Sequence, residues 1–275
     1  MTTPAIICVA ITGSVPRRSD NPAVPVTVSE QIASTRAAWE AGAAIAHCHV
    51  RNDDETPSSD PARFAELKAG IEAACPGMIV QLSTGGRSGA GCERGGMIGL
   101  APDMCSLSVG SNNFPTRVYD NPPDLVDWLA GEMAAHGVIP EIECFDLSHL
   151  YQAAAMYADG RLLTRPYCQF VIGVKNAMPV DRVAFDAMCA SHAHLFGDAP
   201  WCAAGIGPGQ AILNDWAAEA GGHLRTGLED NIRLDRATLA PSNAALVERA
   251  AEAVRRHSRT VASCEEARAI LGLAK

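Results

Sequence analysis

The chain has 275 residues, 48% of them hydrophobic, and 22 basic against 31 acidic residues give a formal net charge of −9. A chain of this length can bury one large core, and α/β barrels commonly form a single domain of this size. The scattered basic residues exclude nucleic acid and anionic membranes as expected partners, and no run approaches the roughly 18 to 20 apolar residues of a membrane-spanning helix.

Short apolar runs alternate with longer helical patterns along the chain, which predicts βα units around a parallel sheet. The eight expected strands cover approximately residues 5–11, 44–50, 78–83, 104–109, 139–145, 167–171, 201–206 and 223–226. The expected helices, about eight in all, include residues 28–41, 61–74, 122–136, 147–157, 181–195, 210–220 and 243–257. Asp60 with Pro61, and Ser242, are helix-start signals. We therefore predict a single (β/α)8 TIM barrel over residues 1–275, with an open doubly wound sheet as the alternative.

Polar and glycine-rich residues gather where the predicted strands end. In a barrel these segments meet at one catalytic rim, which the extended loop 12–25 also lines. They comprise residues 12–14, 47 and 49, 83–87, 106 and 108, 141 and 143, 173–176, 205–209 and 225–230. Turns after parallel strands explain the glycines, but they do not explain the charged residues in apolar surroundings.

His47 and His49 are the strongest chemical signal in the sequence. Side chains alternate between the faces of a strand, so both imidazoles project from one face while Cys48 points away. Two histidines on one face at the end of an apolar strand predict a metal site. A catalytic zinc usually has three protein ligands and one open position. Glu229 is the best third ligand, because the last strand lies beside the first in a closed barrel, and Glu143 is the alternative.

Glu141 and Glu143 repeat the same spacing inside an apolar strand. A buried carboxylate needs a cation, a metal or a substrate group as partner. A structural ion pair and a functional role are equally good interpretations of Glu141, whereas Glu143 lies nearer the rim and is expected to be functional. Residues 205–210 resemble an anion-binding turn, although a structural tight turn explains them as well. Lys175 is expected to be a surface or salt-bridged residue.

The ten cysteines are dispersed, without a Cys-x-x-Cys pair, and most lie in apolar runs. A chain this long does not need disulfides, so we expect reduced core cysteines. The N-terminus lacks a basic region before its short apolar run, which argues against a secretory signal. Together these features predict a soluble, cytoplasmic protein.

Taken in order, six motifs resemble those of the β-keto acid cleavage enzyme family, typified by 3-keto-5-aminohexanoate cleavage enzyme. The resemblance runs nearly the whole length of the chain. The motifs are residues 21–27 (NPAVPVT), 47–51 (HCHVR), 81–86 (QLSTGG), 106–114 (SLSVGSNNF), 140–143 (PEIE) and 221–231 (GGHLRTGLEDN). Any one of them alone is a weak signal, but the ordered set is specific.

The resemblance implies a zinc-dependent (β/α)8 barrel that converts a β-keto acid and acetyl-CoA into acetoacetate and a new acyl-CoA. It implies a homo-oligomer, a tetramer in the family, whose partners are these small molecules. It also implies roles for particular residues. These are zinc binding by His47, His49 and Glu229, proton transfer by Asp230 with Arg225, and a catalytic role for Ser83 in holding the keto acid. The resemblance also implies substrate contacts from Thr84, Gly85, Gly86, Glu143 and a hydroxyl of Ser106 or Ser108, between which the sequence does not choose.

The chemistry implied by the resemblance begins with zinc polarising the ketone, which acidifies C2. Asp230, restrained by Arg225, takes the C2 proton, and the enolate attacks the acetyl thioester. The released CoA thiolate then adds to the original ketone, and cleavage expels acetoacetate. Arg225 and the hydroxyls stabilise negative oxygen along the way.

One departure from the family concerns the substrate. Members that accept an amino-bearing keto acid have an acidic residue soon after the first strand, where this chain has Ser14 and Val15. With one acidic group fewer in the pocket, we expect the enzyme to prefer a neutral or hydroxylated β-keto acid, or one with a single cation that contacts Glu143, over 3-keto-5-aminohexanoate. Which β-keto acid is used is not determined by the sequence.

Three other functions compete with this interpretation. A zinc hydrolase of the amidohydrolase type needs further histidines at the strand ends, and His149, His192, His194 and His223 do not fall convincingly at the fifth and sixth strands. A metal-dependent carbon–carbon lyase acting directly on an acyl-CoA needs an acidic metal ligand on the first strand, and this chain lacks one there. A purely structural metal barrel would have a closed metal shell with no open position.

Overall fold

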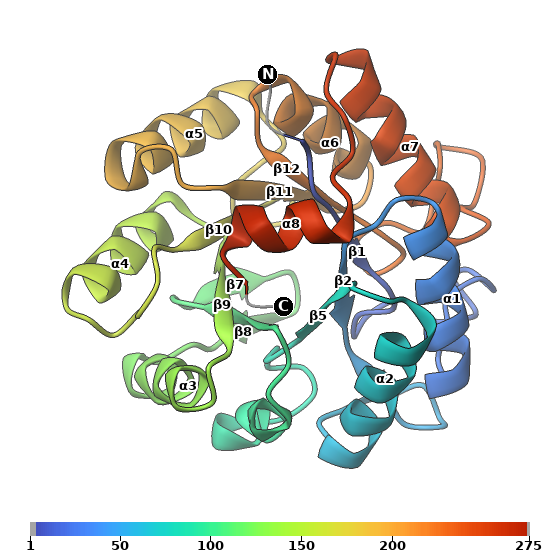
Figure 1. The fold of residues 1–275 in the computed structure, drawn as a ribbon, viewed down its shortest axis with the longest axis horizontal. Helices are drawn as coiled ribbons and strands as arrows, with labels where there is room; N and C mark the ends of the chain where they lie inside the picture. The colour runs from blue at the N-terminus through green and yellow to red at the C-terminus, as the bar shows by residue number, and fades with distance from the viewer. Residues whose placement is uncertain (1–3, 274–275) are drawn as a thin grey trace.

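The computed structural model describes residues 4–273, and it confirms the (β/α)8 barrel (Figure 1). Within these residues, eight parallel strands close in the order β1-β12-β11-β10-β9-β6-β5-β2. Their bounds are β1 Ile7–Ala10, β2 Ile45–Cys48, β5 Ile79–Leu82, β6 Met104–Ser108, β9 Ile139–Cys144, β10 Tyr167–Ile172, β11 Trp201–Gly205 and β12 His223–Thr226. Each matches a predicted strand to within a few residues at its ends, because buried parallel strands are continuous apolar runs. The closed barrel excludes the open doubly wound sheet.

Helices pack around the barrel, and most follow the strands as predicted (Figure 1). They are α1 Val28–Glu40, α2 Pro61–Ala74, α3 Pro123–Ala135, α4 Leu147–Ala158, α5 Arg182–Phe196, α6 Gly209–Glu219, α7 Asn243–Arg256 and α8 Cys264–Leu271. Both predicted start signals are N-caps: the Asp60 side chain accepts from the Ala62 N–H, and Ser242 accepts from the Ala245 N–H. Such caps satisfy N–H groups that have no partner within the helix.

The segment between β5 and β6 departs from the regular pattern. It holds two short 3₁₀ helices, η1 Gly91–Gly95 and η2 Ile98–Leu100, and no α-helix. Six glycines lie between residues 85 and 96, and each glycine loses much conformational freedom when it is fixed in a helix. Two small hairpins complete the structure, β3 Val50–Arg51 with β4 Pro57–Ser58, and β7 Asn112–Phe114 with β8 Arg117–Tyr119.

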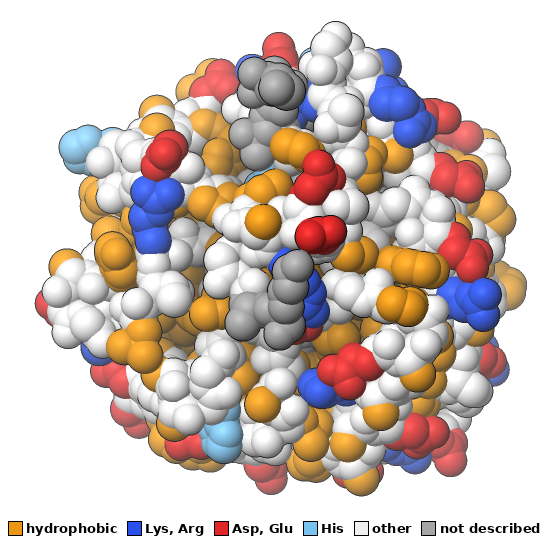
Figure 2. All heavy atoms as spheres, in the orientation of Figure 1, with side chains coloured by type: hydrophobic (Ala, Val, Ile, Leu, Met, Phe, Trp, Pro, Cys, Tyr) orange, Lys and Arg blue, Asp and Glu red, His pale blue; other side chains and the backbone are white. Residues whose placement is uncertain are grey.

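Helix α8 lies across the end of the barrel where the strands begin (Figure 1). Ala262 and Ala267 pack there against a cluster that includes Ile6, Ile79 and Tyr167. This closes the amino ends of the strands and leaves the carboxyl ends for the site. On the face shown in Figure 2, acidic and basic side chains are interspersed around the periphery and do not gather by sign. No helix of the described residues is long and apolar enough to cross a membrane.

A close contact between two strand ends brings the loop after β12 over β1. Gly227 has a φ of +130°, and a side chain there would collide with the backbone of Ala10. Only glycine fits such a conformation at this distance. Because the two segments approach so closely, the Glu229 N–H donates a hydrogen bond to the Ala10 carbonyl at 3.2 Å. It therefore sets the position of Glu229 relative to β2, the other neighbour of β1.

Candidate functional site

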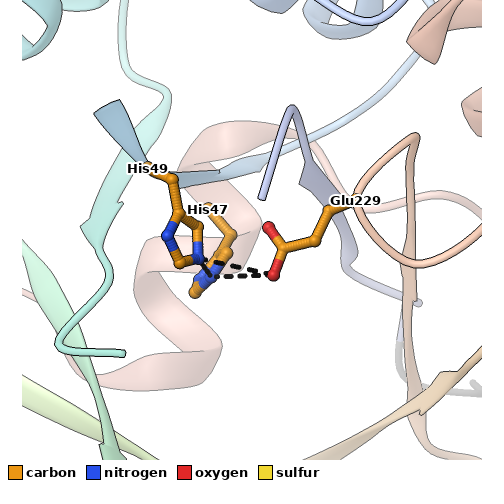
Figure 3. Close-up of side chains that lie close together, drawn as sticks. All are labelled: His47, His49 and Glu229. Carbon is orange, nitrogen blue, oxygen red and sulfur yellow. Dashed lines mark hydrogen bonds and ion pairs between the residues drawn. The ribbon is translucent and has the colours of Figure 1, made fainter. Parts of the chain in front are cut away.

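His47, His49 and Glu229 converge at the carboxyl end of the barrel (Figure 3). His47 lies in β2, whereas His49 is the first residue beyond that strand, so the predicted strand 44–50 is two residues too long at this end. The two Nε2 atoms nevertheless lie 3.3 Å apart. The Glu229 Oε1 lies 3.7 Å from Nε2 of His47 and 3.4 Å from Nε2 of His49.

These three distances fit a tetrahedral metal site. Ligand atoms about 2.1 Å from a tetrahedral zinc lie roughly 3.4 Å from one another, and the observed values are 3.3, 3.4 and 3.7 Å. The second carboxylate oxygen, Oε2 of Glu229, is buried without a hydrogen-bond partner. A buried carboxylate oxygen without a partner costs free energy, and a cation bound to this carboxylate would reduce that cost. The residues present therefore fit a metal.

The surroundings keep the His47 imidazole in a form that can bind a cation. Nδ1 of His47 donates to Oε1 of Gln81, and Nδ1 of His49 lies 3.2 Å from the Ser14 hydroxyl. Because Nδ1 of His47 carries the proton, its Nε2 is left free to face the triad, as in other sites where a second group fixes the histidine tautomer. Burial lowers the pKa of His47 to about 3, and Arg225 adds to the effect. His47 is therefore neutral at physiological pH, which metal binding requires.

Arg225 is the central cation of the site. Its Nε donates to Oδ2 of Asp230 at 2.9 Å, and its Nη2 donates to Oδ1 of Asp230 at 3.0 Å and to Oε1 of Glu229 at 2.9 Å. Burial opposes ionisation of Glu229, but His49 and Arg225 hold the pKa of this carboxyl well below its usual range. Burial raises the pKa of Asp230, with Arg225 opposing. Asp230 is thus an oriented carboxylate with increased proton affinity beside the triad.

Glu141 and Gln169 form the floor beneath Arg225. The Gln169 amide donates to Oε1 of Glu141 at 2.7 Å, and its Oε1 accepts from Nη1 of Arg225 at 3.2 Å. Burial raises the pKa of Glu141 to about 7. Among the described residues Glu141 forms none of the predicted ion pairs with Arg or Lys. It holds Arg225 in place through Gln169 and does not line the cavity above, so its contacts favour a structural role of a different kind.

A cavity of about 1130 Å³ opens over the triad. Its wall includes residues 14–16 and Asp20, which confirms that the loop after β1 lines the catalytic face. Aromatic side chains form another part of the wall: Phe114 stacks on Tyr119 with ring centres 4.8 Å apart, and Phe145 meets both rings edge-on. The volume slightly exceeds the usual range of small-molecule pockets, about 300 to 1,000 Å³, so the cavity has room for a substrate together with part of a larger co-substrate.

The substrate-binding residues implied by the family resemblance divide into two groups. Ser83, Gly85 and Gly86 line the cavity. Thr84 and Ser106 lie behind the wall, where the Thr84 hydroxyl donates to the Ser106 carbonyl at 2.7 Å. Their contacts are with protein groups, so they support the wall from behind.

Ser108 also lies outside the cavity wall and supports Glu143. Its hydroxyl donates to Oε2 of Glu143 at 2.7 Å and lies 3.1 Å from the Tyr119 hydroxyl. Glu143 lines the cavity, and its Oε1 is 4.0 Å from Nη1 of Arg225. Since Glu143 is engaged with Ser108 and lies outside the triad, the geometry favours Glu229 as the third ligand.

Two other predicted rim features lie at the mouth. Lys175 is an exposed cavity-lining residue, as expected for a surface lysine, and no ion pair with another described residue involves it. The turn at 205–210 is tight, because a side chain at Gly205 would collide with the backbone of Gly209. Gln210 donates to the Gly227 carbonyl at 2.9 Å, which supports the structural interpretation of this turn.

The remaining histidines considered for a hydrolase lie outside the triad. His149 is in α4, His192 and His194 are in α5, and Nδ1 of His223 accepts from the Ile6 N–H at the opposite end of the barrel. Among the described residues, the triad is the one group of three or more His, Cys, Asp or Glu with metal-ligand spacing. The amidohydrolase interpretation therefore has no support. All ten cysteines are free, and seven of them are buried.

Sequence reasoning missed three residues of the site: Gln81, Gln169 and Tyr119. Gln81 and Gln169 are uncharged amides inside apolar strands, and both are fully buried. Amides in such a setting need hydrogen-bond partners, so their presence in an apolar run was a usable signal. Tyr119 comes from the β7–β8 hairpin, and nothing in the sequence pattern ties that hairpin to the rim.

The fold and the site together define a TIM-barrel enzyme with a two-histidine, one-glutamate site suited to a metal. The chain belongs to the β-keto acid cleavage enzyme family, whose profile matches residues 4–273. It is 61% identical over 273 residues to a protein of Cupriavidus necator named 3-oxoadipate:acetyl-CoA acetyltransferase, covering 99% of this chain and 96% of that one. It is 36% identical to a 3-keto-5-aminohexanoate cleavage enzyme of Fusobacterium nucleatum, with 98% of each chain covered.

A solved structure supports the fold assignment alone. The apo structure of ObcA superposes with a TM-score of 0.82 at 20% identity, over 92% of this chain and 66% of that longer one. The family membership confirms the resemblance seen in the sequence, and it establishes an enzyme that acts on β-keto acids with acetyl-CoA.

Proposed function

We propose that this enzyme converts 3-oxoadipate and acetyl-CoA into acetoacetate and succinyl-CoA. The observation that carries the proposal is the Arg225–Asp230 pair, bonded through two hydrogen bonds of 2.9 and 3.0 Å, directly beside the metal triad on the floor of the cavity. The relative named as a 3-oxoadipate acetyltransferase supports the choice of substrate.

Zinc is the metal we propose for His47, His49 and Glu229, because two imidazoles and one carboxylate with near-tetrahedral spacing suit a catalytic zinc site. When bound, the ion supplies Lewis acidity that makes the C2 protons of a β-keto acid more acidic. Glu143 lies outside the ligand set in this proposal, and its role is to border the substrate.

Asp230 is the base in the proposed mechanism. Its carboxylate takes a proton from C2 of the β-keto acid, and the raised pKa of Asp230 increases its proton affinity. Arg225 fixes the orientation of this carboxylate and offers positive charge to oxygen atoms that become negative. Ser83, with the backbone of Gly85 and Gly86, borders the keto acid on the β5 side.

The proposed reaction forms one carbon–carbon bond and one carbon–sulfur bond, and it breaks one bond of each kind. The C2 carbanion equivalent attacks the acetyl carbonyl of acetyl-CoA, forming a carbon–carbon bond and releasing the CoA thiolate. The thiolate adds to C3, the original ketone, and the C2–C3 bond breaks. C1 and C2 leave with the acetyl group as acetoacetate after C2 is reprotonated, and C3 to C6 leave as succinyl-CoA.

The charges of the cavity revise the substrate expectation drawn from the sequence. The missing acid near Ser14 favours a neutral, hydroxylated or singly cationic keto acid. The cavity wall also carries Arg87, Lys175 and Arg233, together with the acids Asp20, Glu143 and Asp235. A cation of this wall that has no acidic partner attracts an anionic substrate. A dicarboxylic β-keto acid agrees with this lining, whereas the 5-amino substrate remains disfavoured.

We further propose a cytoplasmic homo-oligomer, a tetramer as in the family. The reduced cysteines support the compartment. Large apolar side chains exposed around α4 and α5, namely Leu163 at 71% and Val183 at 77%, support self-association. Sedimentation velocity measures the oligomeric state. A monomer at micromolar concentration would contradict the proposed tetramer. Fractionation of the source cells tests the compartment, and recovery outside the cytoplasm contradicts it.

A substrate panel tests the proposed function. We expect kcat/KM for 3-oxoadipate to exceed that for neutral 3-oxohexanoate and cationic 3-keto-5-aminohexanoate by at least about tenfold, the effect of one favourable charge contact. Acetoacetate and acyl-CoA are both quantified, with and without acetyl-CoA. A preference for the 5-amino substrate would refute the charge argument, and product without acetyl-CoA would refute CoA transfer.

A further inference from the structure

Arg87 is a cation in the cavity wall without an acidic partner. It lies in the loop after β5 and lines the cavity. Within residues 4–273, no hydrogen bond or ion pair engages its guanidinium group, whose central carbon lies 5.4 Å from the centre of the Phe114 ring. Partial burial and the neighbouring Arg117 lower its pKa, but an arginine remains charged in a protein. A part-buried cation of this kind gains most from an anionic ligand.

The aromatic wall holds Arg87 at a defined place. Phe114, over which the guanidinium lies, stacks on Tyr119, and the Tyr119 hydroxyl is 3.1 Å from the Ser108 hydroxyl beside Glu143. Contact with an aromatic face favours and orients a guanidinium group. The wall thus runs from Glu143, near the floor, to Arg87.

The loop that carries Arg87 begins against the triad. A Cβ atom placed on Gly85 would lie 3.4 Å from Cε1 of His49. Arg87 is two residues further on, and two residues span at most about 7 Å. The two carboxyl carbons of an extended six-carbon keto diacid lie roughly 6 Å apart. A substrate whose keto end sits at the triad is therefore long enough for its far carboxylate to reach an arginine side chain at this position.

The other cations of the cavity are engaged or exposed. Arg225 is bonded to Glu229 and Asp230. Arg249 donates to the Leu234 carbonyl and to Gln210. The three remaining cations, Lys175, Arg233 and Arg236, are exposed, where water and salt weaken a charge contact.

We propose that Arg87 binds the distal carboxylate of a dicarboxylic β-keto acid and so sets selectivity for it over a neutral chain of equal length. This inference rests on the proposed function, and it adds a residue that determines specificity outside the catalytic group. Arg87 makes the contact at the end of the substrate remote from C2. Its loss therefore raises KM more than it lowers kcat.

The test compares wild type, Arg87→Gln and Arg87→Lys on 3-oxoadipate and on 3-oxohexanoate, which has a methyl group in place of the distal carboxylate. We expect Arg87→Gln to reduce the 3-oxoadipate preference in kcat/KM by about tenfold or more, which is the effect expected for loss of one charge contact, and Arg87→Lys to restore part of it. Arg117→Gln is the matched control, because it removes a neighbouring exposed charge that does not line the cavity, and both substrates should change by less than about threefold.

Calorimetric binding of adipate against hexanoate measures the same contact without turnover. Adipate binding that is tight in wild type, lost in Arg87→Gln and kept in Arg117→Gln supports the inference even where the turnover assay disproves the proposed reaction. Equal adipate affinity in wild type and Arg87→Gln, or an unchanged substrate preference, overturns the inference while the proposed function stands.

Discussion

Replacing Asp230 with asparagine should leave the metal bound and reduce kcat by roughly 1000-fold, the range found for removal of a general base. An amide keeps an acceptor for Arg225 but cannot take the C2 proton. Exchange of C2 protons for solvent deuterium, followed by NMR on the β-keto acid without acetyl-CoA, isolates this step, and we expect it to slow as much as turnover does.

The control for this variant is Asp235→Asn. Asp235 lines the same cavity, but it is exposed and accepts hydrogen bonds from the backbone N–H groups of Ala237 and Thr238, which an asparagine oxygen also accepts. This variant should stay within about threefold of wild type, as exposed substitutions do. Rapid C2 exchange in Asp230→Asn would remove Asp230 from the mechanism. A rise in KM with normal exchange would show that Asp230 only orients Arg225.

The second large effect concerns the metal. We expect purified enzyme to contain about one zinc per chain, and His47→Ala, His49→Ala and Glu229→Gln each to hold less than about a tenth of that, because a three-ligand site loses most of its affinity with any one ligand. Activity should fall with metal content. Elemental analysis after dialysis measures the zinc content, and the acetoacetate assay measures the activity.

Glu143→Gln is the matched control for the metal variants, since Glu143 is the other carboxylate that the sequence offered as third ligand. It should retain its zinc, because it contacts Ser108 and lies outside the triad. Near-stoichiometric zinc in Glu229→Gln together with its loss in Glu143→Gln would reverse the assignment. Zinc surviving all three triad changes would place the metal elsewhere.

The barrel could be predicted because its strands are buried on both faces and appear in the sequence as apolar runs. His47 and His49 followed from alternation along such a run. Glu229 followed from closure, since the last strand of a barrel must meet the first, as the pairing of β12 with β1 shows. These inferences use local sequence and one topological rule.

Other features depend on tertiary contacts that local patterns do not encode. The 3₁₀ segment after β5 takes its shape from glycines whose conformations are set by their neighbours. Helix α8 is short, and its role as a plug for the barrel end depends on distant residues such as Ile6 and Tyr167. The position of Arg87 is set by Phe114, 27 residues along the chain in a separate hairpin. Sequence reasoning had no basis for joining these segments.

Carbon labelling shows whether this site exchanges acyl groups through carbon–carbon bond formation and cleavage. Wild-type enzyme is given 3-oxoadipate and acetyl-CoA labelled with ¹³C in both acetyl carbons, and the products are examined by NMR. We expect the label at C3 and C4 of acetoacetate, with succinyl-CoA unlabelled. Label in the succinyl product, unlabelled acetoacetate, or free acetate in place of acetoacetate would contradict the proposed reaction.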